Sequence, residues 1–255
     1  MDIISTLLVF VLGSAIGSFL NVVIDRLPIR KTILLGRSHC DSCKRKLGPL
    51  ELIPIFSYVA LFGKCKTCGY KISFRVFFVE LLVAFLAVFL YSQFLLYGMP
   101  FLTALFVFLI SALFIPIIFI DLNHGIIPDE LTSILTIIVS FFVLLSPLTI
   151  VSHVLSGISA FFFFLALFFI TKGKGMGLGD VKLSFALGLF LGFPKVIAGF
   201  YMAFLGGAII SLLLVFLGKK RFKKGTIPFG PFLVIATFCS YFWGEQLIQL
   251  FLKFL

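Results

Sequence analysis

Long apolar stretches separated by shorter polar segments make up most of the chain. They lie at residues 3–24, 76–97, 100–120, 129–146, 150–171, 181–193, 196–217 and 229–252. Most are close to the ~20 residues that an α-helix needs to cross the hydrocarbon core of a bilayer. The pattern therefore predicts an all-α polytopic membrane protein with about eight transmembrane helices.

The composition agrees with this class of protein. Of the 255 residues, 61% are hydrophobic and 12% are charged, and the mean hydropathy of +1.23 is far above that of soluble domains. The largest polar interruption divides the chain into a first transmembrane helix at 1–24, a loop domain at 25–75 and a seven-helix core at 76–255. No basic segment precedes the first apolar run, so we expect an uncleaved helix and not a signal peptide.

The 21 Lys and Arg residues gather in alternate loops. Residues 26–75 hold eleven of them, residues 172–182 hold three and residues 219–224 hold five, so 19 fall on one predicted face. Short cytoplasmic loops keep basic residues, so this face is predicted to be cytoplasmic and both ends of the chain to be outside. Topology and anionic lipid headgroups account for the net charge of +11, and we expect no nucleic acid partner.

Two CxxC pairs lie in the large loop. Cys40 and Cys43 form the first pair, Cys65 and Cys68 form the second, and 21 residues separate them. This spacing is typical of four-thiolate zinc sites, and a reducing cytosol disfavours disulfides. The loop is too short for a large core, so a structural zinc would stabilise it. Between the pairs, residues 50–58 are apolar enough either to lie against the membrane or to pack under the metal module.

Two aspartates lie where apolar stretches end or begin. Asp121 follows one stretch, and Asp180 precedes another and closes the sequence Gly177-Leu178-Gly179-Asp180. Carboxylates at membrane edges are costly and indicate function. The segment between them is long enough for about two membrane crossings, which returns both acids to one face. Asp180 alone is explained as a helix cap, but Asp121 is expected at the end of a helix, where the dipole disfavours an anion.

Six motifs follow one another along the chain. They are residues 17–28 (GSFLNVVIDRLP), the two CxxC pairs, 74–82 (FRVFFVELL), 121–129 (DLNHGIIPD), 175–183 (GMGLGDVKL) and 227–232 (IPFGPF). Over nearly its whole length the chain therefore resembles the type IV prepilin peptidases, also called prepilin leader peptidase/N-methyltransferases.

The resemblance implies a function and assigns residues to it. It implies a membrane aspartic endopeptidase of the bacterial inner membrane that removes the short basic leader of type IV prepilin or pseudopilin substrates at the cytoplasmic face. Asp121 and Asp180 would be the catalytic pair, and the four loop cysteines would bind zinc. The resemblance also implies N-methylation of the new N-terminus with S-adenosylmethionine, and it links Gly63 to that activity.

A chemical hypothesis follows for the acid pair. Two nearby carboxylates are expected to share one proton, so that one draws a proton from water and the other donates to the scissile carbonyl. Helix dipoles suggest that Asp180, at a helix N-terminus, is the base and that Asp121, at a C-terminus, holds the proton. Asp25, Glu51 and Glu80 are candidate partners for the basic leader.

Three other hypotheses fit part of the sequence. A presenilin-like intramembrane peptidase also has the Gly-x-Gly-Asp motif, but there a tyrosine precedes the first aspartate, whereas Ile120 does so here. A proton-coupled transporter would place its acids near mid-membrane and would show inverted repeats, which this sequence lacks. A structural membrane anchor would leave Asp121 unexplained.

Overall fold

Helices form most of the chain in the computed structural model. The structure describes residues 2–33, 38–145, 147–173, 175–217 and 228–253, and the basic cluster at 219–224 lies outside these ranges. The long helices in the described residues are α1 (Ile3–Arg26), α3 (Phe74–Tyr97), α4 (Phe101–His124), α5 (Asp129–Leu144), α6 (Ile150–Ile170), α7 (Leu178–Leu191), α8 (Lys195–Phe216) and α9 (Gly230–Leu252). Each coincides with one predicted apolar stretch, which confirms the all-α class.

Five of the described helical spans are long and apolar enough to cross a membrane. They are Ile3–Ile29, Phe74–Tyr97, Phe101–His124, Ile150–Ile170 and Lys195–Leu214. With 16 and 14 residues, α5 and α7 would rise only ~24 and ~21 Å, short of the ~30 Å hydrocarbon core. The chain is therefore a multi-pass membrane protein, and the eight crossings stay a prediction.

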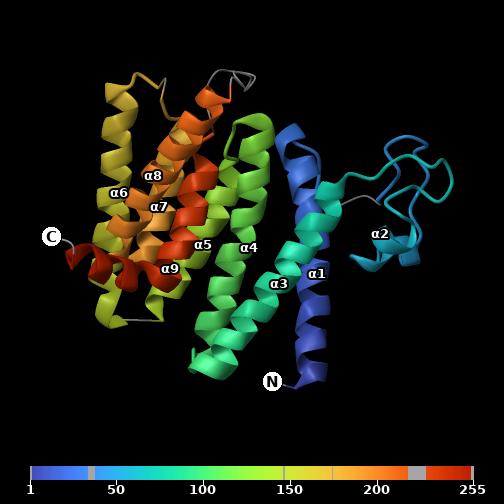
Figure 1. Cartoon of the computed structure of the whole chain (residues 1–255), viewed down its shortest axis with the longest axis horizontal. Helices are drawn as coiled ribbons and strands as arrows, with labels where there is room; N and C mark the ends of the chain where they lie inside the picture. Colours follow the sequence, from blue (N-terminus) through green and yellow to red (C-terminus); the bar gives the residue numbers. More distant parts are fainter. Residues whose placement is uncertain (1, 34–37, 146, 174, 218–227, 254–255) are drawn as a thin grey trace. The chain divides into compact units, whose positions relative to one another are not determined.

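The chain forms two compact units, residues 1–116 and 117–255, and the boundary falls within α4. In the first unit α1 packs along α3 (Figure 1). Glycines allow this close approach, because a Cβ on Gly13 would lie 2.8 Å from the Cβ of Ala87 and one on Gly17 would lie 2.8 Å from the Cα of Glu80. The predicted division at residues 24 and 75 stays a prediction.

In the second unit, α7 is the central helix. It contacts α5, α6, α8 and α9, and ten of its 14 residues are buried. A helix packed against four others is apolar around most of its circumference, which explains why α7 has no broad polar face. Its contact with α6 is close, since a Cβ on Gly188 would lie 2.7 Å from the carbonyl oxygen of Ser156. The N-terminus of this buried helix carries Asp180.

Candidate active site

Asp121 lies in the last turn of α4. The helix ends where Gly125 adopts a left-handed conformation (φ 66°) and donates its N–H to the carbonyl oxygen of Asp121 at 2.8 Å. The Asp121 residue is only 4% exposed, and its Oδ2 accepts the backbone N–H of Gly230, the first residue of α9, at 3.0 Å. Asp121 is therefore part of the C-terminal turn of α4, and its carboxylate lies at the N-terminus of α9.

Asp180 is the third residue of α7, and the residue at the cap position is Gly177. The Asp180 Oδ2 reaches back to accept the N–H of Gly177 at 3.0 Å, so the expected capping role is met from within the first turn. Its Oδ1 is buried and has no hydrogen-bond partner in the part of the chain that the structure describes. A buried carboxylate oxygen without a donor is costly, and it is therefore available for a proton, a water molecule or a substrate.

The second unit brings the two aspartates together. Their carboxylates are close enough to interact electrostatically. Ile127, in the loop between α4 and α5, packs against Gly179, which precedes Asp180, and against Gly230, whose N–H binds Asp121. A Cβ on Gly179 would be 3.0 Å from the Cβ of Ile127, and a Cβ on Gly230 would be 3.2 Å from its Cδ1.

Two glycines beside the acids have steric explanations. A Cβ on Gly230 would lie 2.6 Å from Asp121 Oδ2, so glycine lets the carboxylate stay where it is. Gly179, in the first turn of α7, packs against Ile127, so a side chain there has little room. Ile127 and Gly230 carry no acidic group, so the pattern of acidic residues does not indicate them, although each lies within one of the six motifs.

Helix dipoles do not decide which of the two acids holds the proton. Asp121 lies at a helix C-terminus, but the first N–H of α9 also points at its carboxylate. A helix N-terminus favours an anion, so both aspartates have this stabilisation. The sequence did not reveal it, because Gly230 is 109 residues away from Asp121.

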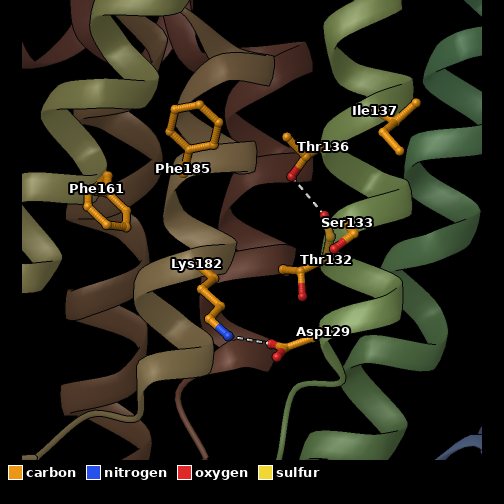
Figure 2. A pocket seen from close by; sticks show the side chains of 8 residues that line it. All are labelled: Asp129, Thr132, Ser133, Thr136, Ile137, Phe161, Lys182 and Phe185. Atoms are coloured by element: carbon orange, nitrogen blue, oxygen red, sulfur yellow. Dashed lines mark hydrogen bonds and ion pairs between the residues drawn. The ribbon is translucent and has the colours of Figure 1, made fainter.

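A groove on the second unit opens between α5, α6 and α7, and neither Asp121 nor Asp180 lines it (Figure 2). It has a volume of about 650 Å³ and is lined by α5, α6 and α7, through Asp129, Thr132, Ser133, Thr136, Ile137, Phe161, Lys182 and Phe185. At one end Lys182, two residues after Asp180, forms a 2.7 Å ion pair with Asp129. The Thr132 and Thr136 hydroxyls donate to backbone carbonyl oxygens of α5 and its cap, so they leave the groove largely apolar.

The four loop cysteines form one cluster in the first unit. Their sulfur atoms all lie within 4.8 Å of one another, and Cys40 Sγ is 3.7 Å from Cys68 Sγ. A tetrahedral zinc with ~2.3 Å bonds to sulfur needs sulfur atoms ~3.8 Å apart, so the spacing fits a metal. In each pair a tight turn bends the chain, with Lys44 donating to Cys40 and Gly69 donating to Cys65.

Thiolate ligands require deprotonated cysteines, and the local backbone favours this form at Cys65. Hydrogen bonds from the backbone N–H groups of Cys68 and Thr67 lower the pKa of the Cys65 thiol to about 6. The four cysteines of the described residues are therefore close enough together to hold a metal ion.

The three acids suggested as partners for a basic leader already have partners in the protein. Asp25 pairs with Arg75 at 2.6 Å, and Glu80 accepts the N–H of Ile55 at 2.7 Å. Glu51 pairs with Arg45 at 2.6 Å, and Arg45 and the N–H of Gly48 lower the pKa of this carboxyl to about 2. These contacts argue for structural roles of the three acids.

Gly63 lies in a restricted place close to the metal cluster. Its φ of 64° is left-handed, and a Cβ there would lie 2.8 Å from the Tyr58 ring. That ring stacks on Phe77 of α3, with 5.2 Å between the centroids. Gly63 therefore sets how the loop packs against α3.

Apolar helices long enough to cross a bilayer, together with two buried and interacting carboxylates, define a polytopic membrane protein with a candidate diacid site. Residues 11–94 match the bacterial peptidase A24 N-terminal domain, and residues 106–214 match the type IV leader peptidase family. The chain belongs to the type IV leader peptidase family.

Relatives named prepilin leader peptidase/N-methyltransferase match nearly the whole chain. One from Bacillus subtilis (strain 168) is 32% identical over 249 residues, which cover 96% of this chain and 97% of the relative. One from Aeromonas salmonicida (strain A449) is 34% identical over 276 residues, which cover 96% and 93%. No solved structure matches the chain. Family membership confirms the predicted resemblance and sets aside the presenilin-like, transporter and anchor hypotheses.

Proposed function

We propose that this protein removes the leader peptide of type IV prepilin-like or pseudopilin proteins and then N-methylates the new N-terminus. The family and the names of its near full-length relatives support both activities. The observation that carries the peptidase proposal is the meeting of Asp121 and Asp180 in one buried site. The enzyme would act in the bacterial inner membrane with this site open to the cytoplasm, as the distribution of basic residues predicts.

In the proposed reaction the two carboxylates share one proton. The ionised carboxylate takes a proton from a water molecule as that water attacks the scissile carbonyl carbon, and the protonated one donates to the carbonyl oxygen. The peptide C–N bond then breaks as the leaving amine takes up the proton that the first carboxylate took from water, and the second carboxylate regains a proton from the hydroxyl of the collapsing intermediate. Asp180 Oδ1, which lacks a partner in the described residues, supports a place for the water or the shared proton.

Packing around the pair supports this chemistry. The N–H groups of Gly177 and Gly230 each hold one oxygen of an aspartate, which fixes the orientation of both side chains. Burial excludes bulk water and strengthens interactions with the developing charge. The apolar groove beside Lys182 is a suitable place for an apolar part of the substrate.

For methylation we propose that the metal is zinc and that S-adenosylmethionine is the methyl donor. The four thiolates of Cys40, Cys43, Cys65 and Cys68 fit zinc, which would hold the loop in its folded form. Gly63 would support this activity by setting the packing of Tyr58 on α3.

The test uses the full-length protein in membranes with a prepilin precursor. Wild type should shorten the precursor, and Asp121→Asn and Asp180→Asn should each abolish cleavage while the protein stays folded. Glu245→Gln, which neutralises an exposed acid of α9 outside both the site and the groove, is the control and should keep cleavage. Full cleavage by either catalytic-site variant would contradict the proposal.

A further inference from the structure

The loop between α1 and α3 exposes many apolar side chains. Leu50 is 77% exposed, Phe56 is 65%, Val59 is 58% and Phe62 is 87%. The short helix α2 (Phe56–Ala60) has no buried residue. So many exposed apolar side chains on the short loop that contains the four cysteines are unfavourable in water. They indicate that something apolar covers this part of the loop.

The backbone of this segment is also held in rarely adopted conformations. Phe62 has a φ of 52° and Ile55 has a φ of 64°, both in the left-handed region that bulky residues avoid. The Ile55 N–H donates to Glu80, which stabilises the turn there. The exposed aromatic ring of Phe62 has no compensating contact large enough to bury it.

The contacts of residues 55 and 58 with α3 indicate how deep this part of the loop lies relative to the membrane. Tyr58 stacks on Phe77, and Ile55 donates its N–H to Glu80 at 2.7 Å. These two α3 residues lie three and six positions after Phe74, or ~4.5 and ~9 Å along the helix. The 24 residues of α3 make a helix ~36 Å long, which exceeds the ~30 Å hydrocarbon core by about 3 Å at each end. The segment that touches Phe77 and Glu80 therefore lies at the boundary between headgroups and acyl chains.

The charge of the same loop fits an anionic surface. Five exposed lysines surround the apolar segment in the described residues 38–73, at positions 44, 46, 64, 66 and 71. Its two acids are Asp41 and Glu51, and Glu51 is paired with Arg45. Apolar side chains flanked by lysines are typical of surfaces that bind anionic lipid headgroups. Figure 1 shows the loop to one side of α1 and α3, near the end where α3 begins.

We propose that residues 50–62, termed the interfacial segment, insert into the headgroup region of an anionic membrane and hold the metal module against it. The apolar side chains of this segment enter the boundary with the acyl chains, and the surrounding lysines contact the phosphates. The inference depends on α3 crossing the membrane and not on peptidase or methyltransferase activity.

The test places one tryptophan reporter in the full-length protein. The single Trp of the chain is removed with Trp243→Phe, and Phe62→Trp adds a reporter at an exposed position where it displaces no packing. Ser42→Trp, at an exposed site in the first CxxC turn, is the matched control in the same background. Each variant is reconstituted in phosphatidylglycerol or phosphatidylcholine vesicles that contain lipids brominated near the headgroup or near the chain end.

In phosphatidylglycerol, the Phe62→Trp emission should shift to the blue and should be quenched more by bromine near the headgroup than near the chain end. The Ser42→Trp emission should remain that of an indole in water. Adding Lys64→Glu and Lys66→Glu to the Phe62→Trp protein should reduce the quenching. A Phe62→Trp emission that matches the Ser42→Trp emission in both lipids overturns the proposal. So does an emission that responds only to an added prepilin, since the segment would then bind a protein.

Discussion

The substitution Gly230→Ala tests whether the backbone of α9 positions the Asp121 carboxylate. The new Cβ would lie 2.6 Å from Asp121 Oδ2, whereas an ordinary contact begins at 3.4 Å, so the carboxylate has to move by 0.8 Å or lose the N–H of Gly230. Misplacing a reacting group by about 1 Å can cost ~100-fold in rate. That factor corresponds to ~2.7 kcal/mol of transition-state stabilisation.

The assay is the initial rate of prepilin cleavage by purified protein in proteoliposomes. We expect Gly230→Ala to lower kcat by roughly 10- to 100-fold with little change in KM, because the groove is untouched. Gly206→Ala in α8 is the control, since its Cβ would meet nothing closer than Phe232 at 3.8 Å. A Gly230→Ala enzyme that cleaves as fast as the Gly206→Ala enzyme would refute the role given to this backbone contact.

Three further substitutions test the packing and the metal. Gly188→Ala, whose Cβ would lie 2.7 Å from a backbone oxygen of α6, should cost about 1–3 kcal/mol of stability, seen as a lower Tm than that of Gly206→Ala. Cys65→Ser should remove most bound zinc in elemental analysis, whereas Cys239→Ser should keep it; equal zinc in both would contradict the cluster. Gly63→Ala and Gly69→Ala share a left-handed φ, but only the first adds a clash with Tyr58. N-methylation should therefore fall at position 63 and not at 69, and equal loss would show that φ alone matters.

Each long helix in the described residues coincides with a predicted apolar stretch, because a bilayer imposes a simple length rule on the sequence. The ends were less predictable. Residues 100–120 became Phe101–His124, so Asp121 lies within the last turn of a helix, and residues 181–193 became Leu178–Leu191, so Asp180 is the third helical residue. Beyond the apolar stretches, α4 continues at its C-terminus and α7 begins earlier at its N-terminus. A hydropathy pattern does not indicate these additional helical residues.

The clustering of the four cysteines was predictable from their spacing, and the structure confirms it, whereas the catalytic role of the two aspartates stays a prediction. The surroundings of these residues were not predictable. The hydrogen bond from Gly230 to Asp121 joins residues 109 positions apart, and no local pattern indicates it. The partners of Asp25, Glu51 and Glu80 likewise depend on tertiary contacts, so an acid that is free in the sequence can be paired in the fold.

Ile127 carries no reactive group, yet its side chain packs against Gly179, which precedes Asp180, and against Gly230, whose N–H binds Asp121. Its bulk acts as a spacer between the starts of α7 and α9, so the placement of Asp180 relative to the N–H that binds Asp121 depends on hydrocarbon volume as well as on hydrogen bonds. A shorter side chain here would let the segments approach and a longer one would force them apart. Variation at this position is thus a way to tune proton sharing without touching either aspartate.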